Sequence, residues 1–462
     1  MGAHDRRVSA EAPHFSGQAA RAQALQGGVR AVVLHPDVKS AGPSDQAAGR
    51  DPQAALAEAV GLAAAIDLDI VDSRVLGLSR IRPATYIGQG AVDALAGLIA
   101  EHEVKVVIVN VALAPVQQRN LERALKAKVI DRTGLILEIF GARARTREGV
   151  LQVELAHLSY QQSRLVRSWT HLERQRGGYG FLGGPGESQI ETDRRLLRDR
   201  IARLRRELAQ VRRTRGLHRQ RRKDAPYPVV ALVGYTNAGK STLFNRVTAA
   251  NVLAKDMLFA TLDPTIRQLP LQSGQTVLLS DTVGFLSDLP TSLIAAFQAT
   301  LEEVCQADLI LHIRDGAHPD SEAQRADVLA VLAELGIGAD IGQGPPILEV
   351  VNKIDMMAAP ERVAWQSRAD RSDDIVAVSA LTGEGLDALF KRIDAMLFQD
   401  AQVLNLKLRP EEGAALAWLY RHGKVLGRRQ DAKAVYLKVR LDEQSLARWR
   451  QERRDQAATI AT

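Results

Sequence analysis

One short segment of the sequence combines glycines, a lysine and a serine at the spacing that a nucleotide phosphate requires. Residues 234–241 read GYTNAGKS and fit the pattern G-x-x-x-x-G-K-[ST]. The glycines let backbone N–H groups approach phosphate oxygens, Lys240 would reach the β- and γ-phosphates, and Ser241 would bind Mg²⁺. A valine-rich run precedes the segment and a helix-compatible run follows it, which is the context this loop needs. We therefore predict a phosphate-binding site here.

Two segments further along the chain would respond to the γ-phosphate. DTVG at 281–284 follows an apolar run, so Asp281 would hold the water shell of Mg²⁺, and the N–H of Gly284 would bond the γ-phosphate. FATLD at 259–263 lies between this segment and the phosphate loop, and we predict Thr261 as the second Mg²⁺ ligand. The predicted catalytic residues are Lys240, Thr261 and Gly284, and the predicted metal ligands are Ser241 and Thr261.

The base would be recognised by two segments that each follow a predicted strand. NKID at 352–355 contains Asp355, whose carboxylate would accept hydrogen bonds from N1–H and N2–H₂ of guanine, a donor pair that adenine lacks. SAL at 379–381 can turn a backbone N–H toward guanine O6. The sequence thus predicts a guanine-nucleotide site. The predicted nucleotide-binding residues are Gly234, Tyr235, Thr236, Asn237, Ala238, Gly239, Lys240, Ser241, Thr242, Phe259, Ala260, Thr261, Leu262, Asp263, Asp281, Thr282, Val283, Gly284, Asn352, Lys353, Ile354, Asp355, Ser379, Ala380 and Leu381.

The residue after DTVG is Phe285, where many GTPases have a glutamine that orients the attacking water. A phenyl ring can neither donate nor accept a hydrogen bond in that role. We therefore expect slow intrinsic hydrolysis, stimulated by a partner that supplies the missing group, unless another part of this chain does so. With no phosphate contact assigned to the ring, replacing Phe285 by alanine is expected to leave nucleotide binding nearly intact.

Composition excludes several classes of protein. A chain of 462 residues is expected to hold about three domains. A single cysteine, Cys305, excludes an internal disulfide framework, fits a reducing cytosol and is expected to be a small core residue. No apolar run reaches about 18 residues and the N-terminus lacks a signal peptide, so we expect a cytoplasmic protein without stable membrane insertion.

The basic charge is concentrated in one block, 143–223, which carries 21 basic and 8 acidic residues, a net charge of +13 against about −6 for the rest of the chain. Such a block suggests a polyanionic partner, or else a solvated helix face. Two apolar stripes with heptad spacing flank a glycine-rich loop at 176–188, which predicts an antiparallel helical hairpin. A packing arm or dimer contact is the alternative. The stripes are Leu151, Leu155, Leu158, Leu165, Trp169 and Leu172, then Ile190, Leu197, Ile201, Leu204, Leu208 and Val211.

Strands and helices alternate before the hairpin, which favours a parallel α/β layer, and LILEIF at 135–140 is expected to continue the alternation. The fold class is therefore α/β: a P-loop GTPase domain with a mostly parallel sheet, preceded by an α/β domain with a helical hairpin and followed by a small α+β appendage. The predicted segments are a disordered tail (1–28), the N-terminal α/β domain (29–142), the basic hairpin (143–224), the GTPase domain (225–399) and the C-terminal domain (400–462).

Several stretches resemble the HflX family, within the Obg/HflX group of translation-factor-like P-loop GTPases. They extend over about residues 75–400 and include GYTNAGKSTLFNR, LFATLDPT, DTVGF, YIGQG, QQRNLERAL, VIDRTGLILEIF, ARTREG, LQVELAHL and ESQIETDRRLLR. The resemblance implies a GTP-dependent factor that binds the large (50S) ribosomal subunit, acts in ribosome splitting, rescue or subunit maturation, and places its hairpin near the peptidyl-transferase RNA. The implied partners are GTP or GDP, the 50S subunit and its rRNA, with Mg²⁺ as cofactor and a monomeric chain.

Two departures from the family pattern qualify this expectation. The loop at 177–187 reads GGYGFLGGPGE and lacks the arginine that family loops often carry, so RNA contact there would rest on backbone, Tyr179 and Phe181. The C-terminal appendage matches the family poorly, which puts any role in contacting ribosomal protein in doubt. Two other functions stay open: an RNA-binding regulatory module that senses GTP with incidental turnover, and a signalling GTPase peripheral to the membrane, whose arginine block binds anionic lipid.

Overall fold

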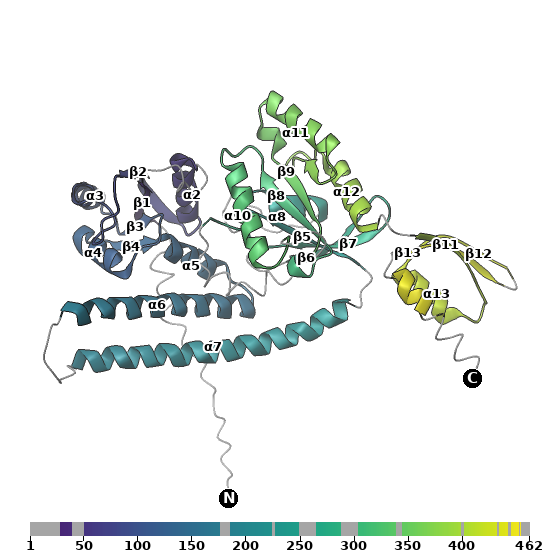
Figure 1. Cartoon of the computed structure of the whole chain (residues 1–462), viewed down its shortest axis with the longest axis horizontal. Coiled ribbons are helices and arrows are strands. Elements are labelled where there is room, and N and C mark those ends of the chain that lie inside the picture. The colour runs from purple at the N-terminus through teal and green to yellow at the C-terminus, as the bar shows by residue number, and fades with distance from the viewer. Residues whose placement is uncertain are drawn as a thin grey trace, which may run out of the picture. The chain divides into compact units, whose positions relative to one another are not determined.

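The structure is a computed structural model (Figure 1) that describes residues 28–38, 50–175, 185–223, 227–248, 265–287, 304–338, 344–398, 402–431, 434–441, 445–451 and 453. The chain divides into two compact units. Within the described residues, one unit comprises Met1–Ala142 with Ser163–Gly180, and the other comprises Arg143–Gln162 with Phe181–Thr462. This division does not follow the five predicted segments one by one, and their boundaries remain predictions.

The first unit contains a four-stranded parallel sheet in the order β2-β1-β3-β4. All four residues of β3 (VVIV) are buried, as expected of a strand covered on both faces by helices. The expectation for LILEIF was wrong in detail: these residues lie in a helix, α5, and the strand before it, β4, was not predicted. The elements are β1 (Val29–Val38), α2 (Pro52–Ala64), β2 (Leu68–Leu78), α3 (Gln89–Glu101), β3 (Val106–Val109), α4 (Pro115–Leu125), β4 (Lys128–Asp131) and α5 (Arg132–Arg143).

The basic block forms two long helices, α6 (Arg147–Gln175) and α7 (Pro185–Lys223), and residues 176–184 between them lie outside the described part of the chain. The first part of α6 lies beside α7 (Figure 1), because Leu151 of α6 packs with Leu204 and Leu208 of α7. Leu151 thus meets the middle of α7, and Glu154, further along α6, meets the earlier residue Arg200 of α7, which is the predicted antiparallel arrangement. Glu154 of α6 also accepts a 2.7 Å hydrogen bond from Arg200 of α7.

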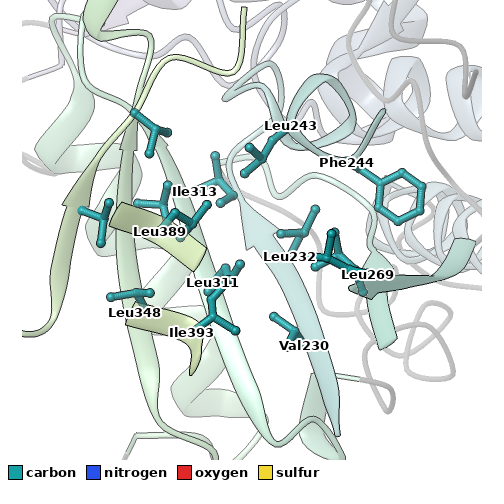
Figure 2. Packing of buried hydrophobic residues seen from close by; sticks show 14 of the residues in the cluster. Val230, Leu232, Leu243, Phe244, Leu269, Leu311, Ile313, Leu348, Leu389 and Ile393 are labelled. Atoms are coloured by element: carbon teal, nitrogen blue, oxygen red, sulfur yellow. The ribbon is translucent and has the colours of Figure 1, made fainter. Parts of the chain in front are cut away.

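The six-stranded sheet of the second unit has the order β10-β9-β8-β5-β7-β6 and is parallel except for the β6–β7 pair. Side chains of α8 and α12 pack on it; Figure 2 shows Phe244 of α8 and Leu389 of α12 against the strands. The elements are β5 (Val229–Gly234), α8 (Lys240–Thr248), β6 (Thr265–Pro270), β7 (Thr276–Asp281), β8 (Leu309–Asp315), α10 (Ser321–Glu334), β9 (Ile347–Asn352), η1 (Ile354–Met356), α11 (Ala359–Arg371), β10 (Ile375–Ala377) and α12 (Leu386–Phe398).

The C-terminal region forms a separate antiparallel sheet in the order β11-β13-β12, with β11 (Gln402–Leu408), α13 (Gly413–His422), β12 (Lys424–Gln430) and β13 (Val435–Leu441). Residues 445–451 are helical. The sheet packs one face on α13 and on Trp449. Strand β12 was not predicted, since Gly427 and a register shift beside it interrupt the alternation of apolar and polar residues.

Two further observations bear on the composition-based expectations. Cys305 is exposed, so its prediction as a core residue was wrong. Among the described helices, none combines the length and the apolar character needed to cross a membrane.

Candidate nucleotide-binding site

The phosphate loop follows β5 and leads into α8, as predicted, and two of its glycines have backbone conformations that a side chain would disturb. Gly234 has φ +153°, and a Cβ there would lie 2.0 Å from the carbonyl oxygen of Ile313. Gly239 has φ +92°, and a Cβ there would lie 2.2 Å from Nδ2 of Asn352. The neighbouring strands therefore require glycine at both positions, independently of any ligand.

Lys240 begins α8 and turns its ammonium group back under the loop. Its Nζ donates hydrogen bonds to the carbonyl oxygens of Gly234 at 3.1 Å and Tyr235 at 2.8 Å. Burial lowers the pKa of Lys240 to about 8, and the nearby carboxylate of Asp281 opposes this shift. The lysine is thus held at the centre of the loop, where an anionic ligand would favour its charged form.

Ser241 and Asp281 place two oxygen atoms side by side at the start of α8 and the end of β7. The hydroxyl of Ser241 donates to Oδ2 of Asp281 at 2.8 Å, and Asp281 is fully buried. A hydroxyl and a carboxylate are the oxygen donors that Mg²⁺ accepts, so this pair fits the predicted ion. No group of three or more His, Cys, Asp or Glu that could hold a metal occurs in the described ranges. The other predicted ligand, Thr261, lies with Phe259, Ala260, Leu262 and Asp263 outside them.

The DTVG segment is joined directly to the phosphate loop by backbone hydrogen bonds. The N–H of Thr236 donates to the carbonyl of Phe285 at 2.8 Å, and the N–H of Phe285 donates to the carbonyl of Gly234 at 3.0 Å. A Cβ on Gly284 would lie 2.8 Å from Cγ2 of Thr236 and 3.0 Å from Nζ of Lys240. Gly284 therefore approaches the lysine closely, as a residue that senses the γ-phosphate must. Thr282 faces the other way, and its hydroxyl donates to the carbonyl of Leu232 at 2.5 Å.

Phe285 is part of the protein core, which corrects one expectation from the sequence. Its side chain is 2% exposed, and its backbone forms a bridge with Tyr235 of the phosphate loop. The ring therefore does not occupy the position of a water-orienting side chain, and its removal would not leave the loop undisturbed.

We predict that Phe285→Ala lowers the free energy of unfolding by roughly 3–5 kcal/mol, as large-to-small substitutions at buried phenylalanines do. Nucleotide affinity should fall with it, because the cavity lies beside the phosphate loop. Thermal unfolding and calorimetric titration with GDP measure both effects, with Phe285→Leu as the control that retains most of the volume. An alanine variant with unchanged melting temperature and affinity would contradict the prediction.

The predicted base-recognition segments meet the phosphate loop through Asn352. Its Nδ2 donates to the carbonyl of Ala238 at 2.8 Å, and its Oδ1 accepts from the N–H of Ala380 at 2.9 Å. Asp355 follows in η1, and its buried Oδ1 has no hydrogen-bond partner in the described structure. An acceptor left in this state is suited to the donors of a guanine base. The N–H of Ala380 is engaged by Asn352, so it is Asn352 that positions the SAL segment.

The structure places the described members of the predicted set around one edge of the sheet, at the carboxyl ends of β5, β7, β9 and β10. The side chains of Lys353 and Leu381 form no hydrogen bond or ion pair with the other predicted residues that the structure describes. The ammonium of Lys353 forms a 2.7 Å ion pair with Asp315, and Leu381 is 69% exposed. Arg246 was not predicted to belong to the site, but its guanidinium donates to the carbonyls of Leu381 and Thr382 at 2.7 and 2.6 Å. Only its position on α8, one turn beyond Ser241, hinted at such a contact.

Comparison with known proteins finds matches to most of the chain, between residues 53 and 455. Four family models match: "GTP-binding GTPase N-terminal" at 53–141, "GTP-binding GTPase Middle Region" at 143–222, "50S ribosome-binding GTPase" at 229–353 and "HflX C-terminal domain" at 364–455. The GTPase HflX of Magnetococcus marinus is 51% identical over 396 residues, which cover 86% of this chain and 90% of that protein. The chain belongs to the HflX family. It is therefore a GTP-binding protein that hydrolyses GTP.

Other relatives are similar over comparable lengths. The GTPase HflX of Escherichia coli is 47% identical over 342 residues, 73% of this chain and 78% of that protein. A putative GTP-binding protein 6 from Xenopus laevis is 35% identical over 410 residues, 87% and 75% respectively. The match of the HflX C-terminal model at 364–455 corrects the expectation that the C-terminal appendage departs from the family.

Proposed function

We propose that this HflX-family GTPase is a cytoplasmic factor that binds the 50S ribosomal subunit, contacts its rRNA through the basic hairpin at 143–223, and acts in ribosome splitting, rescue or subunit maturation. The observation that carries the proposal is a guanine-nucleotide site in a chain whose longest helix presents arginines to solvent. The family model that matches 229–353 is that of a 50S ribosome-binding GTPase, which supports the choice of partner.

The arginines of α7 divide into two groups. Arg200 and Arg203 form ion pairs with Glu154 and Glu207, at 2.7 and 2.8 Å. Four other arginines are exposed at positions off the leucine stripe and form no ion pair with a carboxylate among the described side chains: Arg195, Arg198, Arg205 and Arg213. Guanidinium groups that are not already paired with carboxylates are available for RNA phosphates, with which they bond bidentately.

Within the GTPase site, the chain's own residues bind and orient the nucleotide. Backbone N–H groups of the loop and the ammonium of Lys240 would contact the phosphates, and Gly284 would bond the γ-phosphate. Ser241 and Asp281, with Thr261, would hold Mg²⁺, which when bound offsets charge on the β- and γ-phosphates. No described residue of DTVGF can orient the attacking water, since Phe285 is in the core. Hydrolysis by the isolated protein should therefore be far slower than about 10 s⁻¹, a typical enzymatic rate.

We predict that 50S subunits stimulate hydrolysis and that Arg198→Gln, Arg205→Gln and Arg213→Gln, made together, reduce this stimulation without changing the basal rate. The dependence of 50S affinity on salt should become shallower by roughly two to three counterions, because each lost phosphate contact removes about 0.7–0.9 of one. Steady-state hydrolysis and 50S pelleting over a salt series measure these effects. A control with the same change in charge replaces exposed basic residues of the GTPase region: Arg267, Arg371 and Lys391.

The outcomes of this experiment separate the competing functions. Tight 50S binding with no change in hydrolysis would favour a regulatory module that senses GTP. Binding to vesicles of anionic lipid in preference to 50S would favour a membrane-surface switch. Equal losses in the arginine triple and in the control triple would show that only net charge matters, and would contradict the role of the hairpin.

The glycine-rich tip, which includes residues outside the described part of the chain, gives a second test of the arm. Replacing 177–186 by a short Gly-Ser turn should preserve folding and GTP binding, because a segment with six glycines and a proline is not expected to contribute to an apolar core. Ribosome splitting, followed by light scattering, should be lost even where the arginines still support docking. Splitting at the normal rate would mean that the arm only serves as a scaffold.

A further inference from the structure

The three-stranded C-terminal sheet has a row of basic, aromatic and basic side chains on its exposed face. Tyr436 on the central strand β13 pairs with Lys407 of β11 and with Arg429 of β12. Residues paired directly across antiparallel strands point to the same face, so these three side chains share one face. Tyr436 is 39% exposed, and Nζ of Lys407 lies 5.6 Å from the centroid of its ring.

A second row lies next to the first on the same face. Lys438, two residues after Tyr436, pairs with Asn405 of β11 and Gly427 of β12. A Cβ added to Gly427 would meet only the Cβ of Lys438, at 4.0 Å, so this end of the row is open and shallow. None of the six residues in the two rows is acidic, and all six are exposed.

The opposite face of the sheet already forms the hydrophobic core of this region. Leu437 and Val439 alternate with the exposed residues of β13 and pack with Leu419 of α13 and with Trp449. The hydrophobic core of the region is therefore built without Tyr436 and its basic neighbours. An exposed aromatic residue with no role in the core is more informative than an exposed aliphatic one, because it offers a flat surface for a ligand.

The C-terminal region also has a net positive charge, which cannot be seen from the net charge of all residues outside the hairpin. Residues 402–453 carry 12 Lys and Arg against 6 Asp and Glu. The value of about −6 outside the hairpin thus combines this second positive region with a more acidic remainder. The charge predicts an anionic ligand, and the aromatic ring on the central strand predicts a ligand with planar groups.

We propose that this face binds single-stranded RNA, with one base stacked on Tyr436 and the adjacent phosphates contacting Lys407, Arg429 and Lys438. A central-strand aromatic flanked by basic residues is how sheet surfaces hold unpaired nucleotides, because every base has a π-face and every nucleotide a phosphate. An acidic protein would use the same charges but would gain little from the ring. This inference is independent of the hairpin and adds a second RNA contact to the chain.

The test measures binding of a fluorescein-labelled oligouridylate of roughly 12 nucleotides to the full-length protein by fluorescence anisotropy. All proteins carry Arg198→Gln, Arg205→Gln and Arg213→Gln, so that the hairpin contributes less to the signal. Tyr436→Ala removes the ring and Tyr436→Phe retains it. Tyr420→Ala is the matched control, because Tyr420 is an exposed tyrosine on α13 of the same region.

Tyr436→Ala is expected to weaken RNA binding by roughly tenfold, the effect of losing one stacked base, while Tyr436→Phe and Tyr420→Ala stay within about twofold of the parent. Replacing Lys407, Arg429 and Lys438 by glutamine should weaken binding and flatten its salt dependence. Thermal unfolding of each variant tests whether the sheet is intact, and Tyr436→Leu, which keeps an apolar side chain without a ring, replaces the alanine variant if that one unfolds.

Equal RNA affinity of the parent and of Tyr436→Ala, or of Tyr436→Leu where it replaces the alanine variant, would overturn the proposal. So would a loss caused by the glutamine triple alone, since the face would then be purely electrostatic and suited to an acidic protein. Pelleting with 50S subunits, measured on the protein with its natural arginines, distinguishes this result from failure of the proposed function. Loss of oligonucleotide binding by Tyr436→Ala supports the inference whether or not the wild-type chain pellets with 50S.

Discussion

Asp355→Asn is expected to lower the affinity for GDP and GTP by roughly 10²- to 10⁴-fold and to create a preference for xanthine nucleotides. The carboxylate would accept two hydrogen bonds from guanine, and hydrogen bonds to a charged group contribute about 1.5–3 kcal/mol each. Xanthine carries a carbonyl where guanine carries the amine, so an amide in place of the carboxylate can donate to it. Calorimetric titration with GDP and xanthosine diphosphate measures the change.

The position of Asp355 supports this expectation. Lys353 adopts a left-handed conformation with φ +64°, and Ile354 is buried, so the backbone before the aspartate is held firmly. Asp370→Asn, at an exposed position of α11, is the control for a change of one charge and should leave both affinities unaltered. Guanine binding that survives in Asp355→Asn would show that another group reads the base.

Asn352→Ala is expected to lower the free energy of unfolding of the GTPase region by roughly 2–6 kcal/mol and to reduce nucleotide affinity. The substitution leaves the carbonyl of Ala238 and the N–H of Ala380 without their partner, and each buried unpaired group costs about 1–3 kcal/mol. It also separates the phosphate loop from the segment predicted to reach guanine. Differential scanning calorimetry and titration with GDP measure the two effects.

A second substitution tests whether the geometry of this bridge matters. Gly239→Ala retains Asn352 but places a Cβ 2.2 Å from its amide nitrogen at a position with φ +92°, so it should displace the amide and reproduce much of the loss. Asn120→Ala serves as the control, because it removes an exposed amide that donates to the carbonyl of Ala84 in the other unit. Normal nucleotide affinity in Asn352→Ala would mean that the two segments are positioned independently of each other.

Local sequence patterns were sufficient to predict the sites and secondary-structure elements that are determined by residues close together in the sequence. The turn in GYTNAGKS needs glycine at two positions with positive φ, and this part of the requirement can be read from the residues because it is a local backbone conformation that other residues rarely adopt. The heptad stripes predicted the hairpin for a similar reason: Leu151, Leu155 and Leu158 repeat at the period of one helix, and Leu204, Leu208 and Val211 at that of the other, so each set shares one face of its own helix. The family followed from such motifs, and comparison over 86% of the chain confirmed it.

Only the tertiary structure decided contacts between residues far apart in sequence. Asn352 meets Ala238 because β9 and β5 belong to one sheet, and nothing in the NKID motif specifies that partner. The sequence predicted that Phe285 cannot orient water and that its ring could be removed without effect on nucleotide binding. Only the structure shows that the ring is buried beside the phosphate loop, because burial depends on which residues pack against it. The basic and aromatic face around Tyr436 also depends on contacts between distant residues. The register of the three strands brings Lys407 and Arg429 to either side of the Tyr436 ring. This register could not be predicted, because the alternation of apolar and polar residues in β12 is interrupted.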